Sequence, residues 1–130
     1  MQNFRKLLVW QKAHALAVRI KEVTDSLVRR DRTSFVSQAR RSALSIPTNI
    51  AEGCNRLTDR DFAKFLHIAI ASASELEYQL QFAGDTKILE RREAEQLLMR
   101  AVEVRRMLFG LLKRLDDKGD IPQRGDKNGE

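Results

Sequence analysis

Residues 58–85 read TDRDFAKFLHIAIASASELEYQLQFAGD, and their pattern indicates the fold class of the chain. Apolar residues recur every three or four positions, which is typical of one face of an α-helix. Thr58 can cap the amide three residues on, and Gly84-Asp85 can end the helix. We therefore expect one long helix here. Its predicted core face is Phe62, Phe65, Leu66, Ala69, Ala73, Leu76, Leu80 and Ala83.

The same helix carries a second row of mostly apolar residues, roughly 140–180° around the helix from the core face at 100° per residue. This second apolar row consists of Ile68, Ala71, Glu75, Tyr78 and Phe82. A single bundle cannot cover both faces of one helix, and apolar patches left in water are typical of association surfaces. The row predicts self-association. The alternative is that these are scattered surface apolar residues, which are common.

Three further segments have helical period. The apolar stripe of the first predicted helix is Val9, Ala13, Leu16, Ile20, Val23 and Leu27, widened by Trp10, Ala17 and Val28. The stripe of the second is Ala39, Ala43, Ile46, Ile50, Cys54 and Leu57. The stripe of the fourth is Ala94, Leu97, Leu98, Ala101, Leu108, Leu112 and Leu115. The second stripe stays in phase across Pro47, which indicates a kinked but continuous helix. Short connections between long helices predict an all-α, antiparallel, up-down-up-down four-helix bundle over residues 1–115. Residues 116–130 are polar and predict a disordered tail.

The predicted second helix also has a polar row, at spacings of three and four residues: Gln38, Arg41, Ser45, Asn49 and Glu52. A solvated face explains such a row. The short side chains of Ser45 and Asn49 favour a close-packed contact instead, so we assign the polar row and the second apolar row together to a subunit interface.

The composition argues against several classes of protein. A chain of 130 residues supports one core, and one cysteine excludes an intrachain disulfide framework. His14 and His67 lack partners at metal-ligand spacing, and no nucleophile elbow or phosphate-binding loop is present. We therefore expect no enzyme activity, no metal and no cofactor. No apolar run is long enough to span a bilayer, and we expect a cytoplasmic protein without membrane contact.

The net charge is +6, with 24 Lys plus Arg against 18 Asp plus Glu. Most of the basic residues are Arg, which binds phosphate through two parallel hydrogen bonds. The positive net charge is consistent with nucleic-acid binding but does not identify the binding site. The alternative is that the charge only keeps a small protein soluble. The candidate phosphate-binding residues are Arg40, Arg56, Arg60 and Lys64 near the corner between the second and third helices, and Arg91, Arg92, Arg105 and Arg106 on the fourth.

Residues 37–53, SQARRSALSIPTNIAEG, resemble the signature of the bacterial four-helix bundle proteins linked to intervening sequences of 23S ribosomal RNA. The segment Leu8–Ala13, Phe65-Leu66 and Glu75-Leu76-Glu77 support the resemblance, which covers about residues 4–115. Many members of the family have Gly at the position of Ala71. The resemblance implies a homopentameric ring of bundles. It also implies similarity to the accessory protein of diversity-generating retroelements, which binds nucleic acid and a reverse transcriptase.

Two functions are consistent with these observations. The first is a non-enzymatic, basic, homo-oligomeric bundle that binds the backbone of RNA or DNA with low sequence specificity. The second is an oligomeric adaptor for a protein partner, such as a reverse transcriptase or a ribosome-associated factor.

Overall fold

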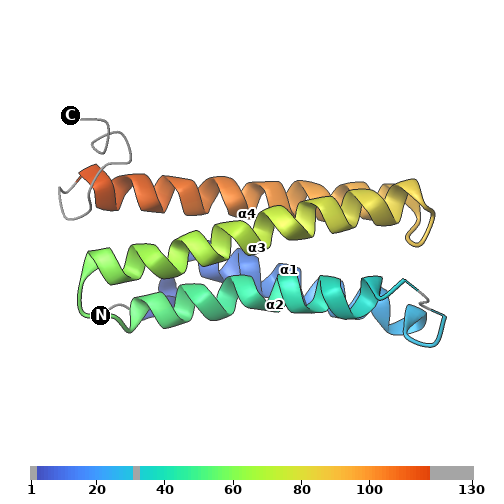
Figure 1. Cartoon of the computed structure of the whole chain (residues 1–130), viewed down its shortest axis with the longest axis horizontal. Helices are drawn as coiled ribbons and strands as arrows, with labels where there is room; N and C mark the ends of the chain where they lie inside the picture. Colours follow the sequence, from blue (N-terminus) through green and yellow to red (C-terminus); the bar gives the residue numbers. More distant parts are fainter. Residues whose placement is uncertain (1–2, 31–32, 118–130) are drawn as a thin grey trace.

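The computed structural model describes residues 3–30 and 33–117, and every regular element in these ranges is helical. The helices are α1 (Leu8–Thr24), α2 (Phe35–Cys54), α3 (Asp59–Asp85) and α4 (Arg91–Asp117), with short 3₁₀ turns η1 (Phe4–Lys6) and η2 (Asp25–Leu27) flanking α1. Figure 1 shows consecutive helices running in opposite directions, with α2, α3 and α4 in one layer and α1 behind them. The predicted four-helix bundle is therefore confirmed for the single chain.

The core is one contiguous cluster to which all four helices contribute. Its largest completely buried apolar side chains are Leu16, Ile20, Ile46, Ile50, Leu66, Leu76, Leu80, Leu97, Leu108 and Val104. Most of these lie on the predicted stripes, since a three-four spacing brings residues to one side of a helix. Val104, Ile70 and Leu111 are buried but lie beside those stripes.

The starts of α2 and α3 differ in how they are capped. At α3 the Thr58 hydroxyl accepts a hydrogen bond from the Asp61 amide at 3.1 Å, as expected from the sequence. At α2 the cap residue Ser34 has a left-handed backbone and makes no side-chain cap bond. Once begun, α2 runs from Phe35 to Cys54 without a break, with Pro47 buried inside it. The predicted continuity across Pro47 is confirmed.

Three helix ends differ from the sequence expectation. The α-helical part of α1 ends at Thr24, where η2 begins, and Val28 is 52% exposed instead of widening the stripe. Leu57 lies beyond the end of α2 and is 88% exposed. The last helix includes Asp116 and Asp117, which we assigned to the tail. The remainder of the predicted tail, residues 118–130, lies outside the described residues.

Candidate nucleic-acid interface

Arg40 is held within the protein at the junction of α1 and α2. Its Nε donates to the Thr24 hydroxyl at 2.9 Å, and its Nη2 donates to Asp25 at 2.7 Å and to the Lys21 carbonyl at 3.3 Å. The Arg40 guanidinium is therefore held against the end of α1, where it shares the Asp25 carboxylate with Lys21. The sequence hypothesis that Arg40 contacts phosphate is not favoured by this geometry.

Four other predicted basic residues have acidic partners on the same chain. Arg105 pairs with Glu77 across the α3–α4 contact, with its side chain only 28% exposed. Arg56 pairs with Glu52 at 3.0 Å and lies over the Phe65 ring at 4.6 Å. The remaining pairs are Lys64 with Asp61 at 3.4 Å and Arg91 with Asp85 at 3.5 Å. These last pairs are exposed, so a phosphate can compete for the cation at little cost.

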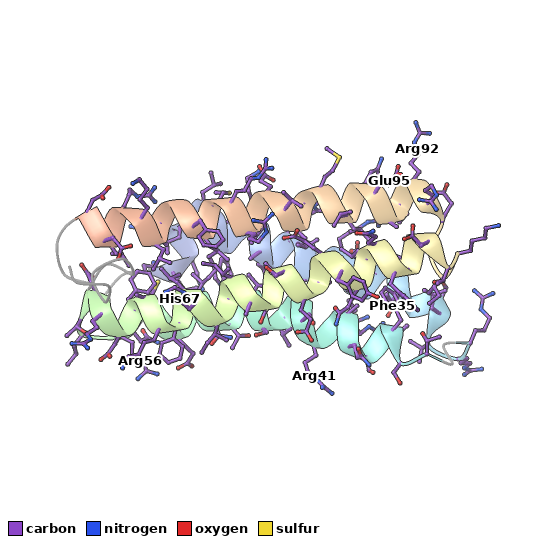
Figure 2. The ribbon with its side chains drawn as sticks, turned by 45° about the horizontal axis from the view of Figure 1, so that its top comes forward. Phe35, Arg41, Arg56, His67, Arg92 and Glu95 are labelled. Atoms are coloured by element: carbon purple, nitrogen blue, oxygen red, sulfur yellow. The ribbon has the colours of Figure 1, made fainter. Side chains whose placement is uncertain are left out.

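Arg60, Arg92 and Arg106 are exposed and have no ion pair to any residue that the structure describes. They do not form one patch, because Arg60 starts α3, Arg92 starts α4 and Arg106 lies in the second half of α4. Figure 2 shows Arg56 and Arg92 at opposite ends of the bundle. The candidate phosphate-binding residues thus form two basic ends, with Arg106 between them.

The sequence analysis did not select other exposed basic residues that also lack an ion pair within the described ranges. They are Arg5, Lys6, Arg29, Arg30, Arg41, Lys87, Lys113 and Arg114. Arg29 and Arg30 follow η2, and Lys87 lies in the α3–α4 connection, so these three add to the end that carries Arg92. The signal that could have identified these three is their position in connections between helices, which lie on the protein surface.

The second apolar row is exposed in the single chain, as the sequence predicts. Tyr78 is 66% exposed, Ile68 47% and Phe82 39%, and Ala71 and Glu75 are also exposed. A pocket of about 310 Å³ lies beside the row, between the start of α2 and the second half of α3. Its lining includes Phe35 and Gln38 of α2, and Glu75, Tyr78, Gln79 and Phe82 of α3. The row is thus a continuous apolar surface with one carboxylate at its centre.

The polar row of α2 divides into two parts. Ser45 shares a hydrogen bond of 2.7 Å with Ser72 of α3, and the Asn49 amide donates to the Ser45 carbonyl at 2.8 Å, so this part packs helices within one chain. Gln38, Arg41 and Glu52 are exposed, and Figure 2 shows Arg41 pointing away from the bundle. Only this exposed part is available to a neighbouring molecule.

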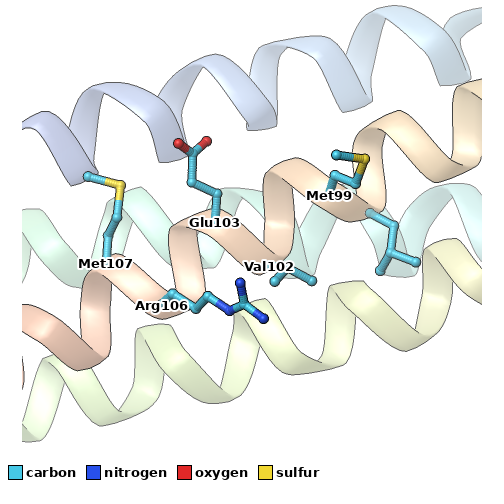
Figure 3. A pocket seen from close by; sticks show the side chains of 6 residues that line it. Met99, Val102, Glu103, Arg106 and Met107 are labelled. Atoms are coloured by element: carbon cyan, nitrogen blue, oxygen red, sulfur yellow. The ribbon is translucent and has the colours of Figure 1, made fainter.

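A surface that the sequence analysis missed lies on the outside of α4. We name Met99, Val102, Arg106, Phe109 and Lys113 the outer row of α4; Met99 is 71% and Phe109 47% exposed. Figure 3 shows Met99, Val102 and Arg106 beside Glu103 and Met107 in an open pocket formed by α4 alone. The row was missed because the search followed only the core stripe of that helix.

The histidines and the cysteine lie in unrelated surroundings. His14 stacks on Trp10 with ring centroids 4.9 Å apart, His67 is exposed on α3 (Figure 2), and Cys54 is buried, which raises the pKa of its thiol. Across residues 3–30 and 33–117, no group of His, Cys, Asp or Glu side chains is arranged to hold a metal ion. No helix in the same ranges has both the length and the apolar character needed to cross a membrane.

The chain was compared with known proteins. Residues 5–110 match the family model described as 23S rRNA-intervening sequence protein. A crystal structure of a protein of unknown function from the S23 ribosomal protein family of Bacteroides thetaiotaomicron is similar, with a TM-score of 0.77 and 30% sequence identity over 82% of this chain and 99% of that chain. A search of curated proteins gives no match.

Proposed function

Because the chain belongs to the 23S rRNA-intervening sequence protein family, we propose that it is a non-enzymatic, basic assembly that binds the phosphate backbone of RNA or DNA with low sequence specificity. The observation that carries the proposal is the set of exposed arginines without an acidic partner among the described residues, represented by Arg60 and Arg92 at the two ends of the bundle. Each can release a counterion from a polyanion, which is the main source of non-specific affinity.

We further propose that the protein assembles through the second apolar row as a homo-oligomeric ring, with five copies as the resemblance implies. The exposed Ile68, Tyr78 and Phe82 support this proposal, since water contact with such a row is unfavourable. A ring multiplies the charge of +6 and presents several basic ends to one nucleic acid, so that weak contacts add up.

Salt dependence of binding tests the nucleic-acid function. A labelled single-stranded RNA is titrated with the protein at graded salt, with fluorescence anisotropy as the readout. We expect the logarithm of the affinity to fall linearly with the logarithm of the salt concentration, by about 0.7 per phosphate contact. Affinity that does not change with salt would overturn the proposal.

A matched pair of variants identifies the residues. Arg60→Gln with Arg92→Gln removes two cations that have no acidic partner in residues 3–30 and 33–117, whereas Arg40→Gln with Arg105→Gln removes two paired ones. We expect the first variant to flatten the salt slope by about 0.7 units for each bundle end that contacts the RNA and the second to leave it nearly unchanged. If both variants keep the full slope while a protein partner survives nuclease treatment in a pull-down, the adaptor function is correct instead.

A further inference from the structure

The second apolar row has a counterpart on the same chain with the same spacing and the opposite charge. In the second apolar row, the positions relative to Glu75 are −7, −4, +3 and +7, occupied by Ile68, Ala71, Tyr78 and Phe82. Measured from Arg106, the outer row of α4 has the same offsets: Met99, Val102, Phe109 and Lys113. Each row is about 21 Å long and has a charge at its centre, and the outer row of α4 carries a second charge, Lys113, at one end.

We propose that the second apolar row of one molecule docks on the outer row of α4 of a second copy of this chain, with Glu75 opposite Arg106. The inference rests on the assembly proposed above and specifies its contact. A contact between two different surfaces is heterologous, so repeating it produces a ring or a filament and not a two-fold dimer.

The charges at the centres of the two rows, on Glu75 and Arg106, are opposite in sign and can form an ion pair between molecules. The Glu75 carboxylate is exposed and accepts only the Ser42 hydroxyl, at 3.1 Å, among the residues that the structure describes. It lines the pocket beside the second apolar row, whose described lining residues include no basic side chain. In that pocket the buried Oε1 of Gln79 accepts no hydrogen bond from any described residue. Arg106 brings five N–H donors and is without an ion pair in residues 3–30 and 33–117.

The flanking residues are complementary when the two helices run antiparallel. In a ring whose axis follows the bundles, all copies point the same way, so α3 and α4 of neighbours run in opposite directions, as they do within one chain (Figure 1). Phe82 then faces Met99, a favourable sulfur–aromatic contact, and the small Ala71 faces the large Phe109. Ile68 meets the aliphatic stem of Lys113.

Charge reversal tests the contact, with the mass from light scattering as the readout. Glu75→Lys and Arg106→Glu each place like charges opposite one another, so we expect each variant to shift the mass from a multiple of 15.0 kDa to 15.0 kDa. Combining the two restores an opposite pair and the larger mass. Arg114→Glu, on α4 but outside the row, is the control and should leave the mass unchanged.

The outcomes separate this inference from the proposal on which it rests. A wild-type mass of 15.0 kDa at about 10 μM overturns the assembly itself. A wild-type oligomer that keeps its mass in both reversed variants overturns only the Glu75–Arg106 contact. Helical content measured by circular dichroism should be unchanged throughout, because both side chains are exposed.

Cysteine crosslinking tests the direction of docking. Phe82→Cys combined with Met99→Cys should form disulfide-linked multimers under mild oxidation. Ile68→Cys combined with Met99→Cys should not, since Ile68 lies 14 residues from Phe82, about 21 Å along the helix. The native Cys54 is 2% exposed and does not compete. The reverse result would exclude the antiparallel arrangement.

Discussion

Gly53, in the last turn of α2, allows that helix to approach the start of α3 closely. A Cβ atom at this position would lie 2.6 Å from Cδ1 of Phe62 and 3.1 Å from Cβ of Phe65. Phe62 is itself buried, so its ring has little freedom to move away. The glycine within the Ala51-Glu52-Gly53 segment therefore has a packing role that no helix propensity explains.

We predict that Gly53→Ala destabilises the fold although alanine favours helix. Overpacking costs about 1–3 kcal/mol, against about 1 kcal/mol gained from helix propensity, so a net loss of up to about 2 kcal/mol is expected in urea unfolding. Gly110→Ala is the control, because its Cβ would meet only the Arg114 guanidinium at 3.9 Å. An equal loss in both variants would contradict the clash with Phe62.

Which arginines are neutralised could be predicted only in part from the sequence. Arg56 with Glu52 and Lys64 with Asp61 are pairs at helical spacing, which a sequence shows directly. Arg105 pairs with Glu77 28 positions away, and Arg40 with Asp25 15 positions away. Such pairs depend on how helices pack, so the sequence analysis retained Arg40 and Arg105 as phosphate ligands.

Among the elements, helices were predictable but some of their ends were not. Apolar spacing is a local property, and it identified all four helices and most of their buried faces. The end of α1 depends instead on Arg40, which reaches from α2 to the Lys21 carbonyl and the Thr24 hydroxyl. A contact between helices thus joins the end of α1 to α2, and periodicity carries no signal for it.

The same junction should make stability depend on pH through Asp25. The hydrogen bond from Lys21, and then the charges of Lys21 and Arg40, lower the pKa of Asp25 below its ordinary value of 3.8. A lowered pKa means that the stabilisation is complete above about pH 4 and is lost as the pH falls through the folded-state pKa. Asp25→Asn should therefore lower the urea midpoint at about pH 7 and have little effect at about pH 2.

The control for this prediction is Glu95→Gln, since Glu95 is exposed on α4 and has no ion pair within the described ranges (Figure 2). Its urea midpoint should follow the wild type at both pH values. A loss in Asp25→Asn that stays constant from neutral to acid pH would mean that the side chain acts by packing and not by charge.

For the whole molecule, the proposals connect assembly with nucleic-acid affinity. The basic ends of one bundle are separated by helices about 40 Å long, so one molecule offers a short nucleic acid only one end at a time. Copies joined through the second apolar row and the outer row of α4 place several ends along a longer strand. Affinity for a long RNA should then depend on apolar residues that never contact it.

Met99→Ser combined with Phe109→Ser tests this dependence without changing the charge. Both side chains are exposed, so the fold should survive while the mass falls to that of one chain. We expect affinity for an RNA of about 60 nucleotides to fall at least about 100-fold, since multivalent binding is lost, and affinity for about six nucleotides to stay within about twofold. An equal loss on both RNAs would instead make the two residues direct RNA contacts. Unchanged affinity for the long RNA, with the mass of one chain, would show that a single bundle suffices and that the ring serves another purpose.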